Sequence, residues 1–287
     1  MTYRSSFYQN PADFLDRTLE ILAKDETKNN LILGLAFRLK ENPQAYGKLS
    51  PLMVSVSDEN GELCAIGLMT PPFAMVVQSE PLNHDALEIL AMDLQLEGWQ
   101  LPGVNGLAEV SDNFARIWQA KTKQKAELIE RLRAYELREL KKIDYPAGKM
   151  RIAEEKDAQM ACYMLNAMQE ESVPGPRRDL TVEGSLESIR KKQSFFWEVK
   201  GEIVASLLAK RPQIKGICIS GVYTLPEHRR KGYARALVAE ASKAMLARGY
   251  EFTNLFTDLD NPTSNKIYQE VGYKPVCDYH LFSFKEF

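Results

Sequence analysis

Apolar side chains near the start of the chain recur at the spacing of an amphipathic helix, as at Phe14, Leu15, Leu19 and Leu22. The pattern then changes to short apolar runs of β-forming residues, two of which flank the turn-forming tetrad at 58–61. A later helical period stops before a glycine, a residue that closes helices readily. The predicted elements of the first half are helices at 12–24 and 31–40, strands at 51–57, 63–69 and 73–77, and a helix at 84–96.

The same order of elements recurs in the second half of the chain. There the pattern predicts helices at 155–171 and 186–192, strands at 195–199, 203–209 and 216–224, and a helix at 234–248. Short stretches also match between the halves, because Gly61 to Ala65 aligns with Gly201 to Ala205 and Gly98-Trp99 aligns with Gly249-Tyr250. This self-similarity predicts a tandem repeat in which each half is one α+β domain.

The boundary between the halves is expected in a short linker at 141–148, which carries Lys, Asp, Pro and Gly. A β-like stretch at 133–140 precedes it, and a strand starting at Met150 follows. The predicted domains are therefore residues 1–142 and 148–287. The charged stretch 121–138 leaves an alternative open, a single solvated helix.

Composition and charge exclude several classes of protein. The 287 residues are 45% hydrophobic and 26% charged, and 37 basic against 39 acidic residues give a net charge of −2. A dedicated nucleic-acid binder is not expected, because no global basic field is present. The apolar runs fall far short of the roughly 20 residues that span a bilayer, and the polar start does not resemble a signal peptide. We expect no membrane partner and a cytoplasmic location.

Cysteine and histidine are too scattered to predict a disulfide framework or a metal site. No CxxC or HxxxH pair occurs. The cysteines are interpreted as small core residues, and no bound metal is expected. The residues concerned are Cys64, Cys162, Cys218, Cys277, His84, His228 and His280.

The segment 221–237 carries the clearest chemical signal. A predicted strand leads into the basic loop Arg229-Arg230-Lys231-Gly232 and directly into a helix. The free amides and positive dipole end of a helix N-terminus attract anions, and glycine permits close approach of a phosphate. The pattern favours a pyrophosphate-bearing ligand, although a basic turn that only caps the helix is the alternative. The Walker and Rossmann glycine patterns are absent.

This segment resembles the acetyl-CoA motif of the GNAT acetyltransferase superfamily, Arg/Gln-x-x-Gly-x-Gly/Ala, which Arg229, Gly232 and Ala234 match. A second match follows in the expected order: a strand at 252–258, then Asn261, a helix with Tyr268, the turn Val271-Gly272-Tyr273 and a last strand at 279–284. The resemblance covers roughly residues 148–287. It implies two tandem GNAT-like domains, each a mainly antiparallel mixed sheet flanked by helices.

The resemblance also implies roles for individual residues. The backbone of the strand end would bind the pantetheine arm of acetyl-CoA, and the loop would bind its pyrophosphate. Asn261 would help to hold the cofactor arm, and Tyr268 would protonate the leaving thiolate. A packed core tyrosine is the alternative for Tyr268. The implied cofactor-binding residues are Val222, Tyr223, Thr224, Arg229, Arg230, Lys231, Gly232, Tyr233, Ala234 and Asn261.

The sequence does not single out a general base. His228 lies within the basic loop, where a local hydrogen bond is the better interpretation. Three acidic residues flank the loop 172–176, which borders the acceptor site in this fold: Glu170, Glu171 and Asp179. Each of them could act directly or through water.

The first half lacks a phosphate loop, because the corresponding segment 78–84 contains no Arg, Lys or Gly. It is therefore interpreted as a degenerate copy without a cofactor site that helps to shape the acceptor cleft, with Trp99, Trp118 and Tyr135 as its core aromatics. The predicted function is acetyl-CoA-dependent transfer of an acetyl group to a primary amine of a small molecule or peptide. The alternatives are a tandem aminoacyltransferase that uses charged tRNA and a CoA-binding regulatory protein without turnover. A homodimer is also left open.

Overall fold

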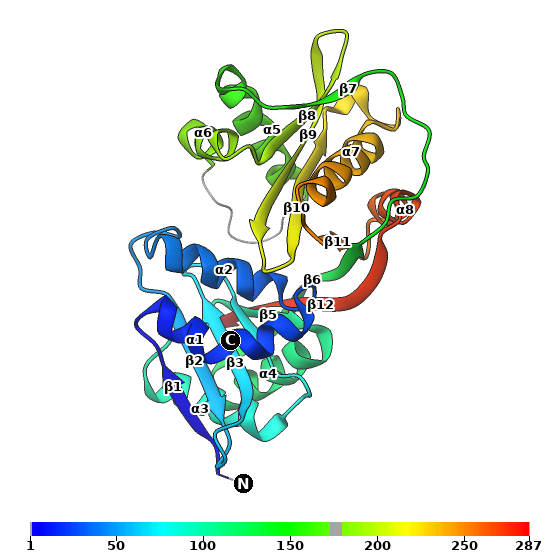
Figure 1. Cartoon of the computed structure of the whole chain (residues 1–287). Coiled ribbons are helices and arrows are strands. Elements are labelled where there is room, and N and C mark those ends of the chain that lie inside the picture. Colours follow the sequence, from blue (N-terminus) through cyan, green and yellow to red (C-terminus); the bar gives the residue numbers. More distant parts are fainter. Residues whose placement is uncertain (1, 173–179, 287) are drawn as a thin grey trace. The chain divides into compact units, whose positions relative to one another are not determined.

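The computed structural model describes residues 2–172 and 180–286. Its internal contacts divide the chain into two compact units. Unit 1 comprises Met1–Arg133 and Cys277–Phe287, and unit 2 comprises Ala134–Val276. Each unit is an α+β fold built on a mixed sheet, so the predicted fold class is confirmed (Figure 1).

Unit 1 places its strands in the order β1-β2-β3-β4-β5-β12-β6. From β1 to β12 the neighbours are antiparallel except for β4 and β5, which run parallel. Its elements are β1 (Arg4–Phe7), α1 (Pro11–Leu22), a 3-10 turn (Ala23–Asp25), α2 (Asn30–Glu41), β2 (Leu52–Ser57), β3 (Leu63–Met69), β4 (Met75–Gln78), α3 (His84–Leu96), β5 (Gly103–Leu107), α4 (Ala108–Lys121) and most of β6 (Gln124–Leu137).

Unit 2 repeats this order along the chain and places its strands in the order β11-β10-β9-β8-β7. Only β10 and β11 are parallel. Its elements are β7 (Lys149–Ile152), a 3-10 turn (Glu155–Asp157), α5 (Ala158–Ser172), α6 (Val182–Arg190), β8 (Ser194–Val199), β9 (Glu202–Pro212), β10 (Gly216–Thr224), a 3-10 turn (Pro226–His228), α7 (Tyr233–Ala247), β11 (Phe252–Asp258), α8 (Pro262–Val271) and the start of β12 (Lys274–Glu286).

Both faces of the central strands are buried, and the alternation of side chains along these strands explains why. In β2, Leu52 and Val54 belong to a core shared with α3 and α4, whereas Met53 between them belongs to a core shared with α1 and α2. Successive side chains of a strand point to opposite faces, so a strand covered on both sides is apolar at consecutive positions.

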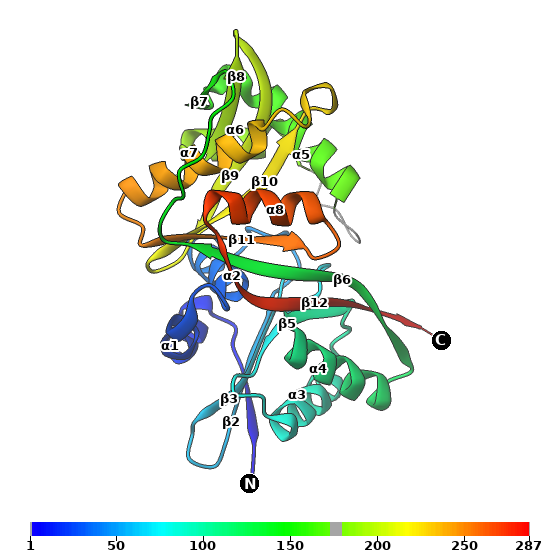
Figure 2. The same cartoon turned by 90° about the vertical axis from the view of Figure 1, so that its right-hand side faces the viewer.

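The helices of unit 2 are arranged in the same way. Leu237, Ala241 and Met245 of α7 are fully buried in one core, as their helical spacing predicts. Helices α5 and α6 cover the other face of the sheet, where Phe196 and Tyr223 join their core. Helix α8 lies beside β11 (Figure 2). The two units thus use equivalent helix pairs on equivalent faces, which confirms the predicted tandem repeat.

The last strand is the main difference from the sequence prediction. The segment 279–284 was expected to complete the second domain, but β12 pairs with β5 of unit 1, with Tyr279 opposite Leu107 and Ser283 opposite Gly103. Conversely, the last residues of β6, from Ala134 onward, belong to unit 2. The units therefore differ from the predicted division at 142–148, because periodicity within a strand does not specify which strand it pairs with.

Two smaller expectations were wrong, and one open alternative is excluded. That alternative, a single solvated helix over the charged stretch 121–138, is excluded because residues 124–137 form strand β6. Tyr135 is fully buried in the core of unit 2, not of unit 1. Of the four cysteines, only Cys218 is fully buried, while the other three are partly exposed.

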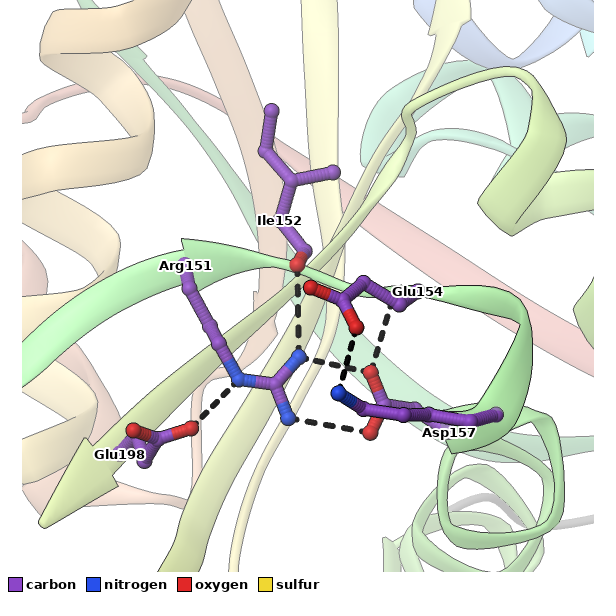
Figure 3. Close-up of polar contacts among 6 residues, drawn as sticks. Arg151, Ile152, Glu154, Asp157 and Glu198 are labelled. Atoms are coloured by element: carbon purple, nitrogen blue, oxygen red, sulfur yellow. Dashed lines mark hydrogen bonds and ion pairs between the residues drawn. The ribbon is translucent and has the colours of Figure 1, made fainter. Parts of the chain in front are cut away.

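An ion-pair network anchors the start of α5 (Figure 3). The Arg151 guanidinium on β7 donates from Nη1 and Nη2 to Asp157 at 2.6 and 3.0 Å, and from Nε to Glu198 on β8 at 2.6 Å. Asp157 also accepts the backbone N–H of Glu154 at 2.7 Å. These bonds hold the pKa of the Asp157 carboxyl below its ordinary value, chiefly through Arg151. The network fixes the helix whose far end reaches the candidate site.

Within the described ranges, no helix is long and apolar enough to span a membrane. Residues 2–172 and 180–286 likewise contain no cluster of three or more His, Cys, Asp or Glu side chains placed to bind a metal ion.

Candidate functional site

A cleft of about 1050 Å³ opens in unit 2 where β10, the loop after it and the first turns of α7 and α8 meet. It is lined by all the residues that the sequence assigned to cofactor binding or catalysis, from Val222 on β10 to Tyr268 on α8. Residues up to 46 positions apart in the sequence therefore share one cavity.

The cleft exists because β10 and β11 separate. In the part of the chain that the structure describes, their parallel pairing covers only Gly216–Cys218 against Phe252–Asn254, although both strands continue beyond it. On its other edge β10 stays paired with β9, with an irregularity between Ser220 and Tyr223. Gly221 lies in this bulge with φ +62°, and a Cβ there would come 2.9 Å from Leu165. One edge of the end of β10 thus has backbone groups without a partner strand.

The first turn of α7 supplies a second set of free backbone groups. Gly232 is the N-cap of α7 with φ +82°, and the nearest atoms to a Cβ there are 4.0 Å away, so the space in front of it is open. The first N–H groups of a helix have no intrahelical acceptor and carry the positive end of its dipole. Arg230 and Lys231 lie exposed beside them, and Lys231 Nζ donates to the Glu227 carbonyl at 3.0 Å. This arrangement favours an anion.

Arg229 differs from its basic neighbours because its guanidinium is already engaged. It donates from Nε to the Thr224 carbonyl at 3.1 Å and from Nη2 to Glu171 at 2.6 Å. It also lies over the ring of Tyr223, with 5.4 Å between the guanidinium carbon and the ring centroid. The side chain therefore joins the end of β10 to the end of α5.

Glu171 is the acidic side chain that the structure brings to this end of the cleft. Its Oε1 accepts the Tyr223 hydroxyl at 2.7 Å, and its Oε2 accepts Arg229. The hydrogen bond from Tyr223, together with Arg229, lowers the pKa of Glu171. Burial, followed by the bond to Glu171, raises the pKa of Tyr223 to about 12. At neutral pH Glu171 is thus an anion and Tyr223 a neutral donor.

Tyr268 is 7% exposed and projects from α8 into the cleft lining. Its ring lies 6.3 Å from that of Tyr135 and 6.0 Å from that of Tyr273, centroid to centroid. Burial raises its pKa to about 12. No described residue forms a hydrogen bond with its hydroxyl. The phenol is therefore a protonated donor with capacity left for a ligand.

The other predicted residues also have defined local roles. Asn261 caps α8, because its side-chain oxygen accepts the Ser264 N–H at 3.0 Å. His228 bonds to Glu202 at 3.1 Å, in line with the local interaction expected for it. Glu170 does not line the cleft, and Asp179 lies outside the described residues.

One ion pair between α7 and α8 in the cleft was not predicted from the sequence. Arg235, in the first turn of α7, donates to Glu270 on α8 at 2.8 Å, and both residues line the cleft. The signal was present in the position of Arg235, one residue beyond the recognised motif. Its partner is 35 residues away and could be found only from the fold.

The corresponding loop of unit 1 is chemically different. Glu80 forms an ion pair with Lys28 at 2.5 Å, and Asn83 caps α3 by accepting the Ala86 N–H at 3.0 Å. The Ser79 hydroxyl in turn accepts the Asn83 N–H at 3.0 Å. This segment presents an acidic side chain and amides that are already bonded.

Comparisons with known proteins agree with this geometry. Residues 158–273 match the model of the acetyltransferase (GNAT) family. No curated protein is significantly similar to the chain in sequence. Among solved structures, a protein from Drosophila shares 14% identity with a TM-score of 0.67, covering 99% of this chain and 98% of its own.

Two further structures also match over nearly the whole chain. A GCN5-related N-acetyltransferase from Sphaerobacter thermophilus shares 17% identity with a TM-score of 0.65, covering 99% of this chain and 95% of its own. An acetyltransferase of the GNAT family from Colwellia psychrerythraea shares 12% identity with a TM-score of 0.59, covering 98% and 100%. These matches show a shared fold over both units.

Proposed function

Because the chain belongs to the GNAT superfamily of acetyltransferases, with the family match in its second half, we propose that it is an acetyl-CoA-dependent N-acetyltransferase. The acceptor would be a primary amine of a small molecule or peptide. The supporting observation is that one cleft combines an unpaired strand edge, a helix N-terminus with a basic loop, and a protonated tyrosine.

The residues present fit acetyl-CoA. The unpaired edge of β10 offers backbone donors and acceptors for the amide-containing pantetheine arm, much as an added strand would use them. The buried Thr224 hydroxyl has no partner among the described residues, which leaves a polar group free at this edge. The α7 amides, Arg230 and Lys231 would hold the pyrophosphate. When bound, acetyl-CoA supplies the activated acetyl group as a thioester.

Tyr268 is suited to donate a proton in this cleft. Its pKa of about 12 keeps the phenol protonated at neutral pH, so its O–H can act as the donor to a thiolate that forms nearby. We assign it the role of general acid.

Unit 1 does not contribute a second cofactor site in this proposal. Its loop carries Glu80 where unit 2 carries basic residues, and the Ala86 N–H in the first turn of α3 is bonded by the Asn83 side chain. We therefore expect one active site per chain, in unit 2.

The experiment that tests the proposal compares two glycine variants. Gly232→Val places a branched side chain at φ +82° in the open space before α7. We expect this variant to bind acetyl-CoA about 10- to 100-fold more weakly. Gly98→Val in unit 1 is the matched control, because Gly98 has φ +76° and a Cβ there would meet no atom within 4 Å. It should bind acetyl-CoA as the wild type does. Calorimetry measures binding, and thiol release over a panel of primary amines measures turnover.

Wild-type affinity in Gly232→Val would overturn the site assignment. Binding of acetyl-CoA without turnover on any amine would refute the enzymatic part of the proposal.

A further inference from the structure

We propose that Glu171 is the residue that holds the amino group of the acceptor, and that Arg229 occupies this carboxylate until phosphates of the acyl donor draw it away. The inference deepens the proposed function and rests on it, because it requires CoA at the loop that follows β10. It assigns a cationic amine as the group recognised at the α5 end of the cleft.

Glu171 lies in the cleft where an acceptor could reach it. It lies in the last turn of α5 and lines the same cleft as Tyr268, which belongs to α8. Of the described residues that line the cleft, only Glu171 and Glu270 are acidic. Glu270 is paired with Arg235 at 2.8 Å and lies 3.9 Å from Lys266. Glu171 is the carboxylate at the other end, where its ion-pair partner Arg229 belongs to the basic loop.

The hydrogen bonds of Glu171 leave part of its acceptor capacity unused. Each carboxylate oxygen accepts one bond, from Tyr223 at 2.7 Å and from Arg229 at 2.6 Å. An ionised carboxylate offers about four acceptor positions, so acceptor capacity remains toward the cleft. Tyr223 is buried on β10 and fixes the direction of the group. An ammonium donor fits such a site because it replaces the charge that Arg229 now supplies.

Arg229 is placed to exchange the Glu171 carboxylate for a phosphate. It is the first residue of the basic loop, and a guanidinium binds carboxylate and phosphate with the same forked geometry. Its ion pair with Glu171 is 42% exposed on both sides, and pairs of this exposure contribute little free energy. A diphosphate carries more charge than one carboxylate. Cofactor binding therefore favours transfer of Arg229 from Glu171 to phosphate, which frees Glu171 for the amine.

The first arm of the test measures CoA affinity by calorimetry. Glu171→Gln removes the competitor for Arg229, so we expect CoA to bind about two- to five-fold more tightly. Glu227→Gln is the charge-matched control in the adjoining turn and should change affinity less. In an Arg229→Gln background, Glu171→Gln should have no further effect. Unchanged or weaker binding in Glu171→Gln, or the same gain in the Arg229→Gln background, would overturn the exchange.

The second arm needs no knowledge of the natural acceptor. Two CoA thioethers of similar shape are compared, S-(2-aminoethyl)-CoA, which carries a primary ammonium beside the sulfur, and S-propyl-CoA, which does not. The wild type should prefer the aminoethyl compound about five-fold, and Glu171→Gln should lose this preference. Glu227→Gln should keep it.

The outcomes of this arm separate the two proposals. If the wild type binds neither thioether, the proposed function fails. Equal binding of both compounds by the wild type refutes the inference alone, as does a preference that survives in Glu171→Gln. Thermal unfolding of each variant shows whether a lost preference reflects a lost fold.

Discussion

The two units contain the same elements in the same order, yet the parallel strand pair in each of them ends differently. In unit 1, β4 and β5 pair from Met75–Val104 to Val77–Gly106, and both strands end one residue later. A Cβ at Gly106 would lie 2.5 Å from the Val77 carbonyl oxygen, so this glycine permits a close contact that leaves no gap. In unit 2, the pairing of β10 with β11 ends at Cys218 and Asn254 after the same number of residue pairs, but β10 continues to Thr224 and β11 to Asp258. The unpaired continuation of these two strands borders the cleft, and unit 1 has no such continuation in its described strands.

The helix that follows each pair reinforces this difference. In unit 1, Asn83 and Ser79 use their own side chains to bond the backbone at the start of α3. In unit 2, Gly232 caps α7 with no side chain at all, and basic residues precede it. The comparison teaches that the fold tolerates either arrangement, since both helices are capped. Ligand binding depends on which amides and strand edges the protein leaves without an internal partner.

The largest effect is expected from removing the hydroxyl of Tyr268 in unit 2. Tyr268→Phe should lower kcat for acetyl transfer by about 10²–10⁴, because it removes one positioned acid. Acetyl-CoA affinity should change little. Thiol-release kinetics measure both. Tyr273→Phe is the matched control, since its buried hydroxyl bonds Ser242 and Thr253 at 2.8 Å instead of facing the cleft. It should lose stability and keep kcat. An unaltered kcat in Tyr268→Phe would remove it as the acid.

The comparison extends to the start of the first helix in each unit. Helix α1 begins at the neutral cap Asn10, whereas α5 follows the ionic network of Arg151 and Asp157. Asp157→Asn should lower the free energy of opening of α5 by about 2–3 kcal/mol, so that its amides exchange faster. Exchange in α1 should not change. Hydrogen exchange with mass spectrometry resolves the two helices. Glu155→Gln, in an exposed pair with Arg190, should leave exchange near that of the wild type.

This network also predicts an acid response at the start of α5. Asp157 has a lowered pKa in the folded protein, so its stabilisation is complete above its ordinary pKa of 3.8 and is lost as pH falls below that value. Protection of α5 should therefore decline on acidification before that of α1. The Asn variant should lack this decline. Equal acid sensitivity of both helices would contradict the assignment.

The sequence predicted the elements well because each carries its own periodicity. The hairpins, α3 and α7 were placed within a few residues, and α7 buries the face that its spacing indicated. The short β1, the glycine-containing β5 and the amphipathic α4 were not predicted. Strand pairing was predicted less well: β12 pairs with β5, far away in the sequence, and its alternation fits either unit equally.

The candidate site shows the same limit. The loop 229–234 was found because its residues are contiguous and its chemistry is local. The link among Glu171, Tyr223 and Arg229 joins positions up to 58 apart and depends on the bulge at Gly221. Sequence analysis named each of these residues, but it left Glu171 as one of three acids and expected Arg229 to face phosphate.

The smallest expected effect tests whether charge alone explains the loss of a site from unit 1. Glu80→Arg gives its loop a cation, yet we expect calorimetry to show the same single equivalent of acetyl-CoA per chain as the wild type. The pairing of Val77 with Gly106 offers no free strand edge, and the Asn83 side chain still accepts the Ala86 N–H in the first turn of α3. Stability should change by less than about 1 kcal/mol, because the lost pair with Lys28 is exposed. A second bound equivalent would show instead that one acidic side chain, and not the closure of the sheet, separates the two units.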